Sequence, residues 1–398
     1  MKITRIKPYL YFPGLAKNLL YVRVETDSGI YGWGEAYVVK NKEMIVSQYV
    51  EMLEPYLLGH SPYETKHMEN ALFCDYALKR ASFDFIAAWS AIEMAMWDIK
   101  GKDCGQPVYN LLGGKVRDKV RVYANGWWGG CTTPEMTAER AKAAVDMGYT
   151  AIKWDPFQGY WRELITQAQE DYAVECVKQV REAVGPNVDL LIELHRRFAP
   201  YYAIRFSERI EEYKPTWIEE PCLADHLDLV TEVKRHIKTP VVTGETLYRK
   251  QEFIPVFENR AADIINPDIG CCGGVTGLME IASMAEPYSV IVSPHNYNST
   301  SIALAATGHC ALVFPNFNIT EVFITIQEPS NAVTINPLKI ENGFLTVPDT
   351  PGFGIDLDMA VLEAHPYSPF KSSFPFAGAM DYKDEYPKEA DFQPETTR

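Results

Sequence analysis

Three glutamates recur at equal spacing, each close behind a short apolar run. Glu193 ends "LLIE", Glu219 ends "WIE" and Glu245 ends "VVTGE", at intervals of 26 residues. If each run is a strand of a parallel barrel, the strand ends meet at one mouth. Three carboxylates gathered there repel one another and lose hydration unless a cation neutralises them. Oxygen-only ligands favour Mg²⁺, with Mn²⁺ as a substitute, so we predict a divalent metal site. Ordinary strand-end acids paired with Lys or Arg are the alternative.

Two histidines stand at the same level of the predicted strands. Asp268 ends the sixth apolar run and His295 the seventh, and a carboxylate beside an imidazole fixes its tautomer and raises its basicity. That arrangement is typical of a general base. His195 shares a strand face with Glu193, two residues away, and is expected across the metal from His295. The other histidines are interpreted as structural: His60, His67, His226, His236, His309 and His365.

Lys153 and Glu321 complete the set of candidate residues. Lys153 ends the second run, where an ammonium group would bind a substrate carboxylate or stabilise an enolate. Glu321 ends the eighth run and, if protonated, would donate a hydrogen bond to an enediolate oxygen. A solvated lysine and a structural glutamate are the alternatives at these two positions.

Eight short apolar runs, most of them separated by helical patterns, would position these residues. They end near Asn125, Asp155, His195, Glu219, Glu245, Asp268, His295 and Glu321. Strands that alternate with helices in this way predict a (β/α)8-type, modified TIM barrel over residues 116–328. Residues 2–37 show strand alternation around a turn and residues 43–113 show helical spacing, which together indicate an α+β capping domain over 1–115. Residues 329–398 hold a few strands expected to pack back on the cap, then a tail, loosely ordered from about 380.

Composition restricts the classes of partner. The 398 residues carry a formal net charge of −15, which argues against nucleic-acid or membrane binding. We find neither a signal-peptide pattern nor an apolar run of the roughly 18 residues that a membrane span needs. The eight cysteines are scattered, which favours reduced thiols and a cytoplasmic protein.

Motifs across nearly the whole chain resemble the enolase superfamily, in its mandelate racemase-like branch. "AIEMAMWDIKGKDCGQPVYNLLGG" is similar to the segment joining cap to barrel, and "WIEEP", "TGETL", "INPDIGCCGGVTG" and "VSPH" are similar to successive strand-end motifs. "VYANGWWGGCTTPE" and "MGYTAIKWDPF" are similar to the acid-sugar dehydratases of the gluconate and galactonate type. Two departures stand out. Lys153-Trp154-Asp155 replaces the Lys-x-Lys of the racemases, and Glu193 stands where most relatives have Asp.

The resemblance implies a mechanism in which Mg²⁺, held by the three glutamates, binds the carboxylate of an aldonic acid. His295, oriented by Asp268, would remove the C2 proton, and His195 would protonate the departing C3 hydroxyl. The enol product would tautomerise to a 2-keto-3-deoxy acid, with Lys153 and Glu321 flanking the carboxylate and the enediolate. The resemblance also implies a homo-oligomer, from dimer to octamer, whose partner is a small acid sugar.

Other functions stay open from the sequence. An epimerase, racemase or cycloisomerase of a hydroxy acid would use the same enediolate, with Lys153 as an opposing base. A metal-dependent hydrolase usually needs more histidine ligands than the two at the predicted mouth. A non-catalytic binding protein is the remaining alternative. Substrate selection would fall to cap loops around residues 11–18 and 74–80, where Lys17 and Arg80 would either contact distal hydroxyls or be solvated charges.

Overall fold

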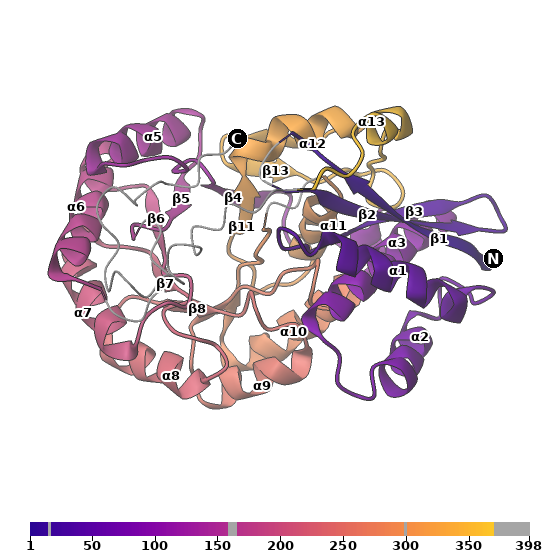
Figure 1. The fold of residues 1–398 in the computed structure, drawn as a ribbon, viewed down its shortest axis with the longest axis horizontal. Coiled ribbons are helices and arrows are strands. Elements are labelled where there is room, and N and C mark those ends of the chain that lie inside the picture. Colours follow the sequence, from indigo (N-terminus) through magenta and orange to yellow (C-terminus); the bar gives the residue numbers. More distant parts are fainter. Residues whose placement is uncertain (15–16, 158–164, 298–300, 370–398) are drawn as a thin grey trace. The chain divides into compact units, whose positions relative to one another are not determined.

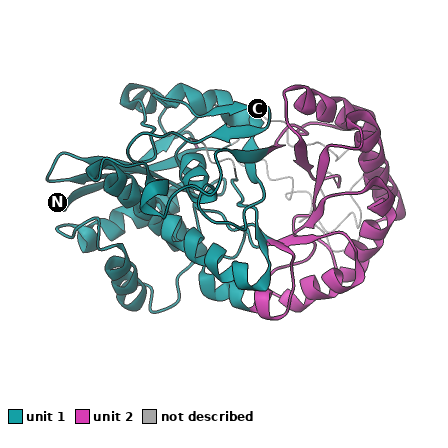
Figure 2. Cartoon of the chain, turned by 180° about the vertical axis from the view of Figure 1, so that it is seen from behind, with its two compact units in different colours: residues 1–122, 244–254, 265–368 teal, residues 123–243, 255–264, 369–398 magenta. Residues whose placement is uncertain are grey.

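The computed structural model describes residues 1–14, 17–157, 165–297 and 301–369 (Figure 1). The tail from about residue 380, expected to be loosely ordered, lies outside the described residues. The chain forms two compact units (Figure 2). Unit 1 comprises residues 1–122, 244–254 and 265–368, and unit 2 is formed mainly by residues 123–243 and 255–264. The domain boundaries expected near residues 115 and 328 stay predictions.

An antiparallel sheet opens unit 1, as the strand alternation predicts. Its strands, in the order β1-β2-β3, are β1 (Ile3–Tyr11), β2 (Leu19–Thr26) and β3 (Tyr31–Ala36). The β2–β3 turn contains Gly29 at φ +83°, a left-handed conformation that glycine adopts without steric cost. Tyr37 directly follows β3.

Helices follow this sheet along the chain, and the first and the longest of them pack against its strands. They are α1 (Glu43–Leu57), α2 (Thr65–Ala71), the π-helix η1 (Leu72–Tyr76), α3 (Phe83–Asp103) and α4 (Val108–Leu111). The Ser82 side chain accepts the Phe85 N–H and so caps the start of α3. α3 lies so close to β3 that a Cβ at Gly34 would be 1.8 Å from the Ala91 carbonyl oxygen. Only glycine allows this approach.

The second sheet has ten strands, and its order along the sheet is β10-β9-β8-β7-β6-β5-β4-β13-β12, with β11 paired to β4. The first eight in sequence are β4 (Val120–Asn125), β5 (Ala151–Trp154), β6 (Asp189–Glu193), β7 (Trp217–Glu219), β8 (Val241–Thr243), β9 (Ile264–Ile265), β10 (Ile291–Val292) and β11 (Thr320–Phe323). Neighbours from β4 to β8 pair in parallel, and Glu193 lies opposite Glu219 in the register of β6 and β7. Strands and helices alternate where the apolar runs predict them, which confirms the barrel-type α/β fold class.

Helices connect these strands. They are α5 (Pro134–Asp146), α6 (Gln167–Val184), α7 (Pro200–Ile210), α8 (Leu227–His236), α9 (Lys250–Glu258), α10 (Gly274–Ala285) and α11 (Ser301–Ala311), with 3-10 turns η2 (Glu211–Tyr213) and η3 (Glu286–Tyr288). Two of these helices begin at side-chain caps. Thr166 and Gln169 form a capping box at α6, and Thr133 caps α5 just before Pro134.

The C-terminal part of unit 1 contains η4 (Ile324–Ile326), α12 (Gln327–Val333), β12 (Lys339–Glu341), β13 (Phe344–Thr346) and α13 (Met359–Ala364). β13 pairs antiparallel with β4, Phe344 opposite Arg121. The Asp356 carboxylate accepts hydrogen bonds from the Tyr31 hydroxyl and the Trp33 indole, both at 2.6 Å. These contacts join the end of the described chain to its first sheet. None of the described helices has the length and apolar character needed to cross a bilayer.

Candidate active site

Two buried carboxylates and a lysine meet at the ends of β5, β6 and β7 in unit 2. The Lys153 ammonium donates to Glu219 Oε1 at 2.7 Å and lies 3.6 Å from Glu193 Oε2. None of the three residues is more than 2% exposed. The Trp217 indole N–H also donates to Glu219, at 3.0 Å. A buried carboxylate is stable only when it is paired, so this lysine is held in place by the two acids it neutralises.

His195 follows Glu193 on a strained turn. Its backbone has φ +48°, and Arg196 has φ +60°, conformations uncommon for residues other than glycine. The turn is held because the His195 backbone N–H donates to Glu193 Oε1 at 2.7 Å. Backbone strain of this kind is often found at functional sites, where it fixes the orientation of a side chain. His195 therefore lies on a turn after β6, not on the strand face that the two-residue spacing predicts, and its imidazole contacts an acid at the end of β5.

Asp155, which the sequence interpretation assigned no role, contacts this imidazole. Its Oδ2 lies 2.6 Å from His195 Nδ1 and also accepts from the Arg197 guanidinium, while its Oδ1 accepts the Phe157 N–H at 2.8 Å. Burial opposes ionisation of Asp155, but Arg197 and His195 more than offset burial and hold its pKa below the usual value. In the sequence, Asp155 ends the second apolar run, two residues after Lys153, but nothing there pairs it with His195.

His295 in unit 1 is surrounded by three carboxylates. Its Nδ1 lies 2.8 Å from Asp268 Oδ2, and its Nε2 lies 3.2 Å from Glu245 Oε2 and 3.4 Å from Glu321 Oε2. Burial alone would lower the pKa of His295, but Glu245, Glu321 and Asp268 raise it to about 9. The acids are positioned in turn, because Asp268 accepts the Gly270 and Tyr297 N–H groups and Glu321 accepts the Asn296 N–H. The expected carboxylate–imidazole pair is therefore present.

Aromatic rings surround His295. Tyr297 stacks parallel to it with centroids 6.3 Å apart, and Tyr37, from the end of β3, lies 6.2 Å away. Lys17 packs over the Tyr297 ring and donates to the carbonyls of Val38 and Tyr297. Lys17 is only 4% exposed, so the interpretation of Lys17 as a solvated charge is wrong, whereas Arg80 is exposed. The sequence shows the charge of Lys17 but not the carbonyls that bury it.

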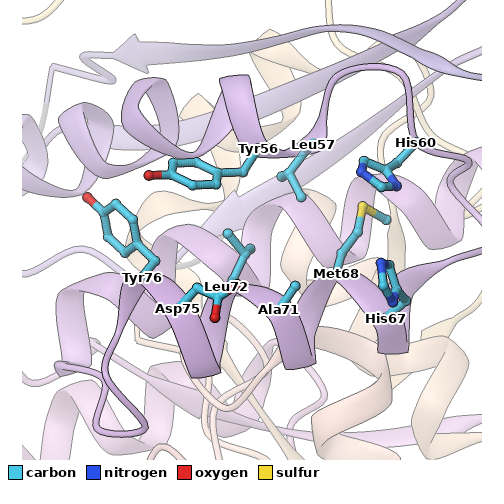
Figure 3. Close-up of a pocket in the computed structure, with 9 residues that line it drawn as sticks. All are labelled: Tyr56, Leu57, His60, His67, Met68, Ala71, Leu72, Asp75 and Tyr76. Carbon is cyan, nitrogen blue, oxygen red and sulfur yellow. The ribbon is translucent and has the colours of Figure 1, made fainter.

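A separate shallow pocket of about 60 Å³ lies among α1, α2 and η1 (Figure 3). Figure 3 shows Tyr56 and Tyr76 at one end and the His60 and His67 rings at the other, with Met68 between helices. His60 Nδ1 lies 3.0 Å from Glu64. The lining contains none of the predicted site residues, so this pocket is not the candidate active site.

Both parts of the chain match models of one superfamily. Residues 15–113 match the mandelate racemase/muconate lactonizing enzyme N-terminal domain, and residues 136–361 match the enolase C-terminal domain-like family. The protein therefore belongs to the enolase superfamily, in the mandelate racemase/muconate lactonizing enzyme branch. Its three strand-end glutamates are all buried, and buried acids of this kind fit a divalent metal site.

Two dehydratases and one solved structure are similar to this chain over most of its length. A D-gluconate dehydratase of Thermoproteus tenax is 36% identical over 357 residues, which cover 89% of this chain and 71% of that protein. A D-galactonate dehydratase of Ralstonia pickettii is 32% identical, covering 91% of this chain and 94% of that protein. The crystal structure of a mandelate racemase/muconate lactonizing enzyme from Jannaschia sp. CCS1 superposes with a TM-score of 0.87 at 32% identity, over 93% of this chain and 99% of that one.

Proposed function

We propose that the protein is a Mg²⁺-dependent dehydratase of an aldonic acid, of the gluconate or galactonate type. The reaction removes the C2 proton and the C3 hydroxyl and gives a 2-keto-3-deoxy acid. One observation carries this proposal: two imidazoles each have a carboxylate on Nδ1, Asp268 for His295 and Asp155 for His195. Dehydration needs one base and one acid, and each pair suits one of these tasks. The dehydratase relatives support the same reaction.

The base of this reaction is His295. With Asp268 on Nδ1, the ring presents Nε2 to the substrate and takes the C2 proton there. Glu321, held by the Asn296 N–H, lies 3.4 Å from the same Nε2 and would donate to an enediolate oxygen when protonated. In unit 2, Lys153 supplies a fixed positive charge for the substrate carboxylate. His195 gives its proton to the leaving C3 hydroxyl, which departs as water.

The metal would be held by Glu193, Glu219 and Glu245. The donor set fits, because all three are buried carboxylates and such oxygen ligands match Mg²⁺ or Mn²⁺. Glu193 and Glu219 end neighbouring strands, and Glu245 follows β8, the next strand of the sheet, by two residues. A cation there would supply positive charge against the developing enediolate.

A keto-acid assay over a panel of aldonic and aldaric acids, with Mg²⁺ and with chelator, tests the proposal. We expect metal-dependent 2-keto-3-deoxy product from at least one aldonic acid. His295→Asn should abolish both product and the exchange of the C2 proton with deuterated solvent, whereas His195→Asn should stop product and spare exchange. Deuterium at C2 of recovered wild-type substrate without keto acid would instead favour an epimerase. The cytoplasmic location and the homo-oligomeric state stay predictions.

A further inference from the structure

A carboxylate on the strand before His195 controls how that imidazole is presented. Asp155 lies two residues after Lys153 and directly follows β5. Its Oδ2 is 2.6 Å from His195 Nδ1, closer than the 2.8 Å of the Asp268–His295 pair. Each carboxylate–imidazole pair comes from the ends of two neighbouring strands. Asp155 and His195 belong to unit 2, and Asp268 and His295 belong to unit 1.

Asp155 is itself fixed from the opposite side. The Arg197 guanidinium donates to Asp155 Oδ2 and, through Nη1, to the Phe157 carbonyl at 2.9 Å. Asp155 is 4% exposed and Arg197 5% exposed, whereas the His195 side chain keeps 27% of its surface. The carboxylate and guanidinium therefore form a buried support, and the imidazole they hold is the member that substrate can reach.

The hydrogen-bond chemistry then determines which ring nitrogen is presented. An ionised carboxylate only accepts, so the Nδ1 facing Asp155 carries a hydrogen in both the charged and the neutral ring. Arg197 Nη2 lies 3.4 Å from the same Nδ1 but donates to Asp155 Oδ2, so the carboxylate, at 2.6 Å, is the nearer partner of that nitrogen. Proton transfer to a substrate is left to Nε2.

We propose that Asp155 is the positioning residue of the acid step, an inference that rests on the proposed dehydratase function. It holds the Nδ1–H form of His195, so that Nε2 delivers the proton to the C3 hydroxyl of the sugar acid. The Nε2–H bond and the C3–O bond break, the electron pair of the enediolate becomes the C2–C3 double bond, and water leaves. His195 is left neutral, with its Nδ1–H still bound to Asp155. The aspartate in place of the second lysine thus suits elimination.

A substrate with a different leaving group separates this role from a structural one. Fluoride leaves C3 with little help from an acid, so a 3-deoxy-3-fluoro aldonate of the active configuration needs His295 but little from His195. Asp155→Asn should lower kcat for loss of water by about 10²-fold, within the usual contribution of general acid catalysis. It should change fluoride release and C2 deuterium exchange by less than about threefold, since neither depends on the acid step.

The matched control is Asp189→Asn, the same substitution at the opposite end of β6, where Asp189 accepts a hydrogen bond from Thr216. It should leave the ratio of water loss to fluoride loss unchanged. Equal losses of both reactions in Asp155→Asn would mean a structural role and would overturn the inference, as would an unchanged water loss.

A second readout needs no turnover. In ¹⁵N-histidine NMR spectra, assigned with His195→Asn, the His195 ring should show a protonated Nδ1 in the wild type and lose it in Asp155→Asn. The same signal in both proteins would overturn the inference. A wild type that eliminates neither water nor fluoride from any panel acid would refute the proposed function instead, and the NMR signal would still decide the Asp155–His195 assignment.

Discussion

Acid should destabilise the protein through His309 of α11, a histidine outside the candidate catalytic set. The ring has no solvent exposure and stacks on Tyr109, with centroids 5.4 Å apart. The Tyr109 N–H faces Nδ1 at 3.3 Å, and Nε2 lies 3.2 Å from the Phe353 carbonyl. A carbonyl only accepts, so Nε2 carries the hydrogen and Nδ1 accepts. A second proton on Nδ1 would point at another N–H group.

The size of the effect follows from the pKa of His309, which burial lowers from 6.5 to about 4 despite the raising influence of the Phe353 carbonyl and Asp349. Between these pH values the unfolded chain binds a proton that the folded protein does not. Stability from this group is complete above pH 6.5 and is lost as the pH falls towards 4. The full loss is about 3 kcal/mol, and about 2 kcal/mol is lost between pH 8 and pH 5.

The measurement is urea unfolding of wild type and His309→Gln at pH 8 and pH 5. Gln cannot titrate, so the variant should lose about 2 kcal/mol less than wild type over this interval, whatever its stability at pH 8. His236→Gln on α8, where the ring is exposed, serves as the control and should behave as wild type. Equal acid losses in wild type and His309→Gln would refute the reasoning.

Three further predictions concern single side chains. Gly34→Ala should cost at least about 2 kcal/mol in urea unfolding, because the new Cβ overlaps a carbonyl of α3, while Gly129→Ala, with 3.7 Å to its nearest neighbour, should cost much less. Mg²⁺ should raise the melting temperature of the wild type, and Glu219→Gln should lose most of that rise; an unchanged rise would argue against this ligand. Glu170→Gln should lower the free energy of unfolding in urea by about 2 kcal/mol, because two arginines of α7 lose their buried carboxylate partner, and kcat should stay within about twofold.

The strand positions were predictable because each barrel strand combines a buried apolar run with a polar end. Even β9, only two residues long, lies where "DIINPD" predicts it. The pairing of β13 with β4 was not predictable. The 330–365 segment was expected to pack on the cap, and nothing in "NGFLTV" specifies a partner more than 200 residues earlier. Local patterns define elements, whereas long-range partners depend on the assembled sheet.

The candidate residues were predictable to the extent that strand parity decides which side chains share a face. The strand-end positions placed His295 beside Asp268, as the structure has them, but they did not predict that Lys153 contacts Glu219. The sequence interpretation missed Asp155, because an acid two residues from a lysine is ordinary in sequence and its contact with His195 depends on the turn after β6. Tyr37 and Tyr297 were missed as well, since tyrosine is common in strands and its contact with His295 depends on tertiary packing.

The hydrogen bond between Trp33 and Asp356 has a consequence for synthesis of the protein. Its two ends are 323 positions apart, and the Trp33 ring has no solvent exposure in the finished fold. At roughly 5 to 20 residues per second, a ribosome needs about 15 to 65 s after Trp33 to synthesise the chain as far as Asp356. During that time the first sheet of the nascent chain holds an indole N–H without its carboxylate. A chain cut short before Asp356 would leave both the Trp33 indole and the Tyr31 hydroxyl without this carboxylate acceptor.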